Sequence, residues 1–284
     1  MRPHSRLVER APAKLNLHLH VGLPLRDGRH PLESLVAFAD IGDEIVVEPA
    51  NDLSLAIDGP FAEALKDEAD NLVLRAARLL GARGAAIRLT KNLPVASGIG
   101  GGSADAAATL RALNKLWDLQ LSLVELAEKG AALGADIPAC VHARACWMSG
   151  TGEETAPVSL PGLSAVLVNP LVPAPTGAVY RTFDAMHLGA SFARIAPPAW
   201  ESAASAIQGL TALENDLTAP AIAIAPAVAE VITVLSADPR ARLVRMSGSG
   251  ATVFALTWDR ADADAVAASL ADRPWWVRAA TLAG

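Results

Sequence analysis

The chain has 284 residues, a net charge of −6, and Lys and Arg residues that are scattered without forming a basic stripe. This length allows one large domain or two ordinary ones, each with a substantial core. The mildly acidic balance argues against nucleic acid or an anionic membrane as the main partner, so we expect a small-molecule substrate.

The sequence contains no segment that we expect to cross a membrane or to direct secretion. The first ten residues are charged and lack the apolar stretch of a secretory signal. The longest apolar stretch, residues 219–229, contains Pro220 and Pro226 and is too short to span a bilayer. We therefore expect a cytoplasmic protein with no membrane partner.

The first predicted element is a strand over residues 11–21, in which apolar and polar residues alternate with a period of two. Its polar face carries Lys14, Asn16, His18 and His20. Such a face is commonly solvated. A cation and an amide held on a rigid strand also suit a phosphoryl-transfer site.

A hairpin turn is predicted directly after this strand, at Asp27 and Gly28. His30 follows the turn. It is either a turn residue or a ligand contact.

A glycine-rich loop leads from a predicted strand, residues 85–90, into a predicted helix that opens at Ser103. The first turn of a helix offers unpaired N–H groups and the positive end of the helix dipole, which together suit a phosphate. The loop matches neither the dinucleotide fingerprint nor the Walker A pattern. It is therefore either a plain glycine turn or another kind of phosphate site.

A capping box of Ser122 and Glu125 predicts a helix over residues 123–133, which Gly134 ends. Asp136 lies in the short loop beyond, and Pro138 suits the first turn of a following helix. Asp136 is interpreted as a helix cap or as a catalytic carboxylate, and one residue can serve as both.

A proline-rich passage, residues 160–175, predicts a domain boundary near residue 160. It encloses a short strand at 165–168. The mixture of helices and short strands beyond it is typical of an α+β fold. The predicted helices are 178–186, 199–207, 227–236 and 261–271, and the predicted strands are 243–246, 252–256 and 275–281.

Residues 245–252, Arg-Met-Ser-Gly-Ser-Gly-Ala-Thr, lie between two of these strands and predict a hairpin turn. A second glycine-serine loop could also approach a phosphate. The two cysteines, Cys140 and Cys146, are predicted to be ordinary buried thiols, and the six dispersed histidines form no metal motif.

Taken in this order, the segments resemble the GHMP family of small-molecule kinases. That family has an N-terminal strand motif, a Pro-x-x-x-Gly-x-Gly-Gly-Gly-Ser type of loop and a C-terminal Gly-Ser-Gly loop, and the sequence contains all three. The resemblance implies an α+β, two-domain GHMP kinase fold. Residues 1–160 would form the ATP-binding domain, similar to ribosomal protein S5 domain 2, and residues 161–284 a ferredoxin-like domain.

Further segments resemble the subgroup of this family that phosphorylates 4-diphosphocytidyl-2-C-methyl-D-erythritol (CDP-methylerythritol); they are residues 12–17, 27–30, 71–77, 134–138 and 214–217. The resemblance implies transfer of phosphate from ATP, with Mg²⁺, to the 2-hydroxyl of that alcohol, on the non-mevalonate route to isoprenoid precursors. It implies a monomer or a weak homodimer. The alternatives are a GHMP kinase for a homoserine or mevalonate type of alcohol, and a catalytically silent nucleotide-binding protein.

The resemblance also implies the site residues. Lys14 and Asp136 match the catalytic pair, and Ser103 is a possible Mg²⁺ ligand. The ATP site would comprise Asn71, Lys91, Pro94, Val95, Ala96, Ser97, Gly98, Ile99, Gly100, Gly101, Gly102, Ser103 and Ala104. The substrate site would comprise Asn16, Arg29, His30, Thr176 and Gly248.

The sequence departs from the subgroup pattern at two of these positions. Arg29 stands where an aromatic residue usually stacks on cytosine, although a guanidinium plane can also stack on a base. Ala104 stands where relatives often have a second serine. The other stacking partner is either Tyr180 or Phe183, and spacing does not choose between them.

Overall fold

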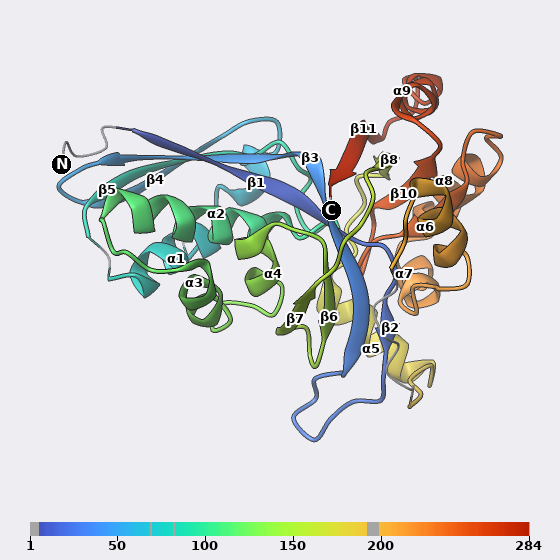
Figure 1. Ribbon diagram of the computed structural model, residues 1–284, viewed down its shortest axis with the longest axis horizontal. Helices are drawn as coiled ribbons and strands as arrows, with labels where there is room; N and C mark the ends of the chain where they lie inside the picture. The colour runs from blue at the N-terminus through green and yellow to red at the C-terminus, as the bar shows by residue number, and fades with distance from the viewer. Residues whose placement is uncertain (1–5, 69, 82, 192–198, 284) are drawn as a thin grey trace. The chain divides into compact units, whose positions relative to one another are not determined.

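The computed structural model describes residues 6–68, 70–81, 83–191 and 199–283 (Figure 1). Contacts between residues group the chain into two compact units. The first unit comprises Met1–Ala13, Ile41–Val95 and Gly100–Ala143, and the second comprises Lys14–Asp40, Ala96–Ile99 and Arg144–Gly284. The first unit ends at Ala143, whereas the sequence predicts a boundary near residue 160. Two long strands, β1 (Leu7–Asn16) and β3 (Leu32–Pro49), contribute residues to both units.

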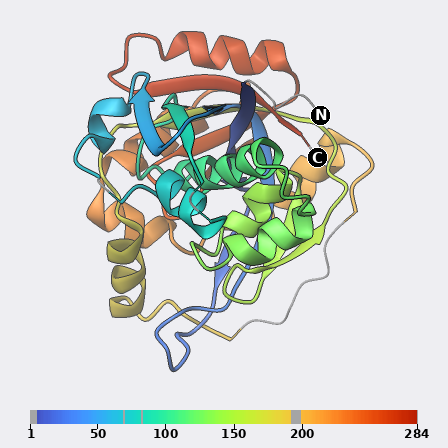
Figure 2. The ribbon, with the colours of Figure 1, turned by 90° about the vertical axis from the view of Figure 1, so that its left-hand side faces the viewer.

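The first unit has a sheet covered by helices on one face (Figures 1 and 2). Strand β5 (Ala85–Thr90) pairs antiparallel with β3 and parallel with β4 (Leu53–Asp58). Ala85, Ile87 and Leu89 of β5 are buried, as their period of two predicts. The helices of this unit are the 3₁₀ helix η1 (Ala62–Leu65), α1 (Leu72–Leu79), α2 (Gly101–Leu116), α3 (Leu123–Gly130) and α4 (Ile137–His142).

The second unit contains an antiparallel sheet in the order β11-β8-β10-β9. Its strands are β8 (Leu163–Asn169), β9 (Leu243–Met246), β10 (Val253–Thr257) and β11 (Trp276–Ala283). Helix α8 (Ala227–Ser236) precedes β9, and α9 (Arg260–Ser269) links β10 to β11. This βαββαβ order confirms the predicted ferredoxin-like domain.

The core of the second unit lies between this sheet and its helices. Val166 of β8 and Val253 of β10 share one apolar cluster with Val231 of α8 and Val266 of α9. Burying a side chain of this size contributes about 1.5–3 kcal/mol to folding. The remaining elements of this unit are β2 (His20–Val21), β6 (Cys146–Ser149), β7 (Glu154–Pro157), α5 (Thr176–Ala185), α6 (Ala203–Leu210) and α7 (Thr218–Ile224).

Most predicted elements are present, with shifted ends. The strands predicted at 85–90 and 243–246 have the predicted bounds. The strand predicted at 11–21 is divided, because β1 ends at Asn16 and β2 is a separate two-residue strand. The helix predicted to reach residue 133 ends at Gly130, and α2 begins at Gly101 rather than at Ser103. Both cysteines are buried thiols, as predicted.

Among the residues that the structure describes, no helix is both long and apolar enough to cross a bilayer. The apolar stretch at 219–229 lies across α7 and the start of α8, which Ala225 and Pro226 separate.

Candidate active site

The glycine-rich loop, defined here as residues 94–102, turns into α2 through left-handed backbone conformations. The φ angles are +51° at Ala96, +75° at Gly98 and +64° at Gly100, which is the N-cap of α2. A left-handed φ is easy for glycine and costs other residues roughly 1–2 kcal/mol. Gly101, Gly102 and Ser103 therefore form the first turn of α2, and the helix offers no acceptor to their N–H groups.

Backbone packs directly on backbone at Gly98. A Cβ built on Gly98 would lie 2.5 Å from the carbonyl oxygen of Ser247, and a Cβ on Gly248 would lie 2.8 Å from the carbonyl oxygen of Gly98. The Ser247 hydroxyl donates to the Gly98 carbonyl (3.0 Å) and accepts from the N–H of Asn16 (3.0 Å). Residues 247–252 thus form the predicted hairpin turn between β9 and β10, and this turn supports the glycine-rich loop.

The polar face of the first strand is buried. Lys14, Asn16 and His18 are 3%, 4% and 0% exposed, so the solvated-face interpretation is wrong. The N–H of Lys14 donates to the carbonyl of Ile99 (2.9 Å), which joins the strand to the loop. The Asn16 amide donates to the hydroxyl of Ser34 (2.8 Å).

His18 is a neutral residue in this face. Burial, followed by the positive charges of His20 and Arg245, lowers the pKa of His18 from 6.5 to about 3. Arg245 donates to the carbonyls of Leu17 (2.6 Å) and Leu210 (2.9 Å). His18 therefore adds no charge to this face at neutral pH.

Asp136 is the N-cap residue of α4, and Pro138 lies in the first turn as predicted. The Asp136 side chain, which is half-buried, does not make the capping hydrogen bond. The capping interpretation is therefore right about position and wrong about the hydrogen bond. Lys14 belongs to the second unit and Asp136 to the first, so their action as a catalytic pair stays a prediction.

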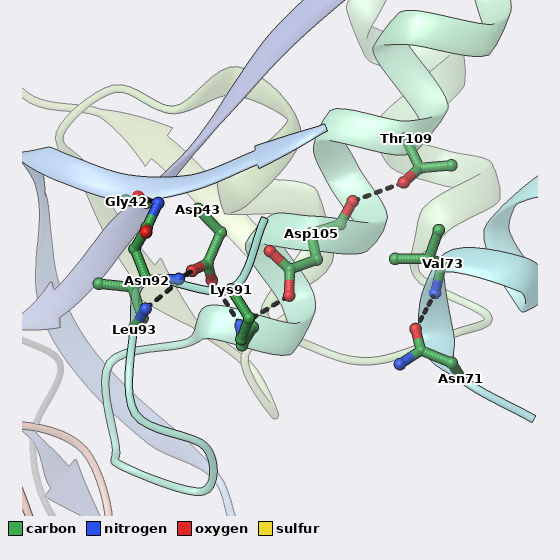
Figure 3. A network of polar contacts seen from close by, with 9 residues as sticks. All are labelled: Gly42, Asp43, Asn71, Val73, Lys91, Asn92, Leu93, Asp105 and Thr109. Atoms are coloured by element: carbon green, nitrogen blue, oxygen red, sulfur yellow. Dashed lines mark hydrogen bonds and ion pairs between the residues drawn. The ribbon is translucent and has the colours of Figure 1, made fainter. Parts of the chain in front are cut away.

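Lys91 lies in a buried cluster of charges that Figure 3 shows. Its ammonium contacts the carboxylate of Asp43 and lies 2.7 Å from Oδ2 of Asp105. Burial alone would lower the pKa of Lys91, but Asp105 and Asp43 offset this effect and raise that pKa. Burial raises the pKa of Asp105 from 3.8 to about 7, although the Lys91 charge opposes the shift.

Asp43 and Asp105 are not among the site residues predicted from the sequence. A signal was available for Asp105, because this carboxylate follows the glycine-rich loop inside an alanine-rich helix that has to be buried. A charge in such a position needs a partner of opposite sign. Lys91 is the cation it meets, so the predicted proximity of Lys91 to adenine remains untested.

Asn71 is the N-cap of α1, and its side chain accepts from the N–H of Val73 (2.8 Å, Figure 3). It is 5% exposed. A Cβ built on Gly102 would lie 3.5 Å from Cδ1 of Leu72, the residue after Asn71. The beginning of α1 therefore lies beside the first turn of α2, and Asn71 is a neighbour of the glycine-rich loop.

His30, one of the predicted substrate residues, lies against α5 in the second unit. Nδ1 of His30 donates to the carbonyl of Gly22 (2.9 Å), and Nε2 lies 3.4 Å from the carboxylate of Asp184. The His30 ring lies 5.1 Å from that of Tyr180 and 5.8 Å from that of Phe183. Phe183 is fully buried, whereas Tyr180 is half-buried.

Arg29 and Thr176 are both exposed residues of the second unit. The Arg29 guanidinium contacts the carboxylate of Asp27 (2.8 Å) and the hydroxyl of Thr151 (2.9 Å). The hydroxyls of Thr176 and Ser249 lie 2.9 Å apart, which connects α5 to the Gly-Ser-Gly turn. The structure thus brings Asn16, Thr176 and Gly248 close to one turn, residues 247–250, and His30 close to α5.

Family models match both parts of the chain. The model described as GHMP kinases N terminal domain matches residues 71–144, and the model described as GHMP kinases C terminal matches residues 190–274. Together with the glycine-rich loop on α2, these matches define a small-molecule kinase. The chain belongs to the GHMP kinase family.

Curated relatives and solved structures agree with this class. A 4-diphosphocytidyl-2-C-methyl-D-erythritol kinase of Cereibacter sphaeroides is 50% identical over 278 residues, covering 96% of this chain and 98% of the relative. An enzyme of the same name from Caulobacter vibrioides is 46% identical over 284 residues, covering 96% of this chain and 98% of the relative.

The fold is also similar to that of solved kinases. A crystal structure of 4-(cytidine 5'-diphospho)-2C-methyl-D-erythritol kinase has a TM-score of 0.78 and 33% identity, with 98% of this chain and 100% of that chain covered. Homoserine kinase from Cytophaga hutchinsonii has a TM-score of 0.62 at 18% identity, with coverage of 99% and 95%, and it supports the fold alone.

We predict that Gly98→Ala and Gly102→Ala have different effects. The first should disturb the packing that supports the loop, whereas the second should affect ATP binding alone. Gly98→Ala should lower both the melting temperature and the affinity for ATP, because its Cβ would collide with Ser247 and its φ is left-handed. Gly102→Ala meets nothing closer than 3.5 Å. It should keep the melting temperature within about 2 °C, an effect of about 1 kcal/mol or less, yet weaken ATP binding, since the methyl group fills space that a phosphate needs.

Thermal unfolding and calorimetric titration with ATP measure the two effects. Equal ATP affinity in wild type and Gly102→Ala would contradict the prediction that a phosphate approaches this turn.

Proposed function

We propose that the protein transfers the γ-phosphate of ATP to the 2-hydroxyl of CDP-methylerythritol, giving the 2-phosphate and ADP in the formation of isoprenoid precursors. The observation that carries this proposal is the set of relatives named for this kinase, 44–50% identical over nearly the whole chain. The retained Lys14, Asp136 and glycine-rich loop support an active enzyme, because a silent binding protein has no need for the first two.

The glycine-rich loop would hold the β- and γ-phosphates of ATP. Phosphoryl transfer passes through a loose transition state, so the enzyme mainly aligns the reactants and stabilises charge on the moving group. The N–H groups at the first turn of α2 provide donors and a favourable dipole for that charge. Strand β1, the Gly-Ser-Gly turn and the buried charge cluster all contact the loop or its flanks, and these contacts would restrain the N–H groups.

Asp136 would orient the acceptor hydroxyl and take its proton, and Lys14 would favour the ionised carboxylate and the transition state. Burial strengthens such electrostatic effects. Lys14 is almost fully buried at 3% exposure, so a charge developing near it would be poorly screened by water.

Mg²⁺ fits this site as a partner of the nucleotide rather than as an ion held by the protein alone. The described part of the chain contains no group of three or more His, Cys, Asp or Glu residues that could hold a metal. Mg²⁺ commonly binds through substrate phosphates and one or two protein oxygens. Ser103, in the first turn of α2, would supply a hydroxyl, and the ion would neutralise phosphate charge.

We assign stacking on cytosine to Tyr180 rather than to Phe183. Phe183 is 0% exposed within the core of the second unit, so its faces are already covered. Tyr180 is half-buried and lies 5.1 Å from His30. Arg29 is engaged by Asp27 and Thr151, and it would have to leave these exposed partners to stack on a base.

A kinase for another small alcohol is the alternative within the same family. Such an enzyme would share the glycine-rich loop but would not need the Asp27-Gly28 turn followed by His30. Homoserine kinase and mevalonate kinases share the fold at 10–18% identity, which does not extend to their substrates.

We predict that the purified protein releases ADP from ATP and Mg²⁺ when CDP-methylerythritol is added, and not with homoserine or mevalonate. A coupled assay for ADP with each alcohol tests this specificity. Comparable turnover with homoserine or mevalonate would reject the proposed acceptor while leaving the kinase class intact.

Asp136→Asn should reduce kcat by about 100-fold or more while ATP still binds, because the amide cannot accept the hydroxyl proton. Asp52→Asn, the same substitution at an exposed residue of the first unit, should leave kcat unchanged. Near-normal turnover by Asp136→Asn would exclude the proposed role of this carboxylate.

Tyr180→Ala should raise KM for CDP-methylerythritol about tenfold, since stacking on a base contributes about 1–3 kcal/mol. Tyr180→Phe retains the ring and should stay within about twofold of wild type. Steady-state kinetics at saturating ATP measure both. An unchanged KM in Tyr180→Ala would assign cytosine recognition to other residues.

A further inference from the structure

Lys91 is one of the largest side chains that the structure buries almost completely. Its side chain is 2% exposed, and those of its partners Asp43 and Asp105 are 0% and 4% exposed. Removing three charges from water costs several kcal/mol for each ion, and well-packed apolar residues often serve stability equally well. Stability alone is therefore a weak reason for this cluster, and its position gives a better one.

The cluster joins the two segments between which the glycine-rich loop lies. Asp43 Oδ1 accepts from the backbone N–H groups of Asn92 (2.5 Å) and Leu93 (2.8 Å), which lead into the loop (Figure 3). Asp105 lies on α2, four residues after the first helical residue. The 2.7 Å contact between Lys91 Nζ and Asp105 Oδ2 therefore ties the entering segment to the departing helix.

We propose that the Lys91–Asp105 ion pair, anchored by Asp43, closes the base of the glycine-rich loop and so positions the loop N–H groups for the triphosphate. Lys91 is then a positioning residue that acts through Asp105. The inference rests on the proposed ATP site and deepens it, because it says what holds that site in shape.

The contacts of Lys91 support a role inside the protein. Its backbone N–H donates to the carbonyl of Asp58 (2.7 Å), its carbonyl accepts from the N–H of Phe61 (3.1 Å), and its ammonium contacts two carboxylates. A Cβ on Gly101 would lie 3.0 Å from Lys91 Nζ, so the ammonium lies directly against the first residue of α2.

The charge balance of the cluster also suits a neighbouring triphosphate. With both carboxylates ionised, the cluster would carry a net negative charge beside the loop. Burial raises the pKa of Asp105 to about 7, and Oδ1 of Asp105 has no hydrogen-bond partner among the described residues. Near neutral pH the cluster is therefore protonated part of the time, which reduces repulsion of a bound anion.

Asp105→Ala is the sharpest test, since it cuts the tie to α2 but leaves Lys91 paired with Asp43. Loss of a charge-assisted hydrogen bond should raise the dissociation constant for ATP with Mg²⁺ about tenfold. Backbone amides of residues 94–101 should also exchange faster in the ligand-free protein, as hydrogen-exchange mass spectrometry would show. Asp105→Asn retains an acceptor for the ammonium and should restore ATP affinity to within about threefold of wild type.

Thr109→Val is the matched control. Thr109 is buried one turn further along α2 and donates to the Asp105 carbonyl (2.8 Å), so its loss perturbs the helix without cutting the tie. It should lower the melting temperature but leave ATP affinity and loop exchange at wild-type levels. If Asp105→Ala does not fold, Asp105→Leu, which fills the space without the charge, takes its place with the same expectations.

Two results would overturn the inference: wild-type ATP affinity and loop exchange in the folded Asp105 variant, or an equal loss of both in Thr109→Val. Failure of the wild-type protein to bind ATP would instead reject the proposed function. Loop exchange in the ligand-free protein would then still report on the ion pair, so the two failures are distinguishable.

Discussion

The phosphate-binding interpretation depends on one constraint: the first N–H groups of α2 must remain accessible while the chain that leads to them is held still. Side chains would obstruct such N–H groups, so glycine occupies four of the nine loop positions, 98 and 100–102, and glycine by itself gives a flexible backbone. The rigidity therefore has to come from neighbours. Ser247 bonds to Gly98, and Lys14 donates from its backbone to Ile99. Residues far apart in sequence thus serve one short stretch of main chain.

The residues around the glycine-rich loop include several buried charges. Lys14, Lys91, Asp43 and Asp105 are each almost fully buried, although ions of this kind are usually exposed. Lys91 is paired with two carboxylates, whereas His18 avoids a charge altogether because burial lowers its pKa to about 3. Protonation is thus controlled by burial at His18, and by burial together with ion pairing at Asp105 of α2. A substrate with several negative charges requires both, since uncompensated carboxylates would repel it.

Local signals in the sequence predicted local structure well. The capping box at Ser122, the period of two in β5 and the glycine signal at residues 248–250 each depend on neighbours in sequence, and each is present in the structure. The solvated-face interpretation of the first strand failed because alternation shows that a strand has two faces, but not whether other segments cover both. Here, Ser34 and Ser247 lie against its polar face.

The buried charge cluster was missed for a related reason. Asp43, Lys91 and Asp105 are separated by 48 and 14 residues, and no periodicity connects them. Only pairing of β3 with β5, followed by the return of the chain into α2, brings them together. The predicted site residues lie in sequence motifs. The residues that hold those motifs in shape lie far apart in the sequence, and only the fold brings them together.

Recognition of the acceptor follows different physics from recognition of ATP. The glycine-rich loop offers backbone groups, which any nucleotide triphosphate can use, so it defines the donor but carries little information about the alcohol. Under the proposed function, that information would come from the side chains around His30, which forms a small aromatic group with Tyr180. Arg29 lies beside this group with its charge paired to Asp27 on the surface, where an ion pair contributes little and exchanges readily with water. In the proposed substrate site, His30 is thus held in place by the Gly22 carbonyl, whereas Arg29 has exposed contacts that it can exchange. A base stacked on Tyr180, as proposed, would be covered by that ring, so the arginine at position 29 removes one aromatic stacking face and leaves the other.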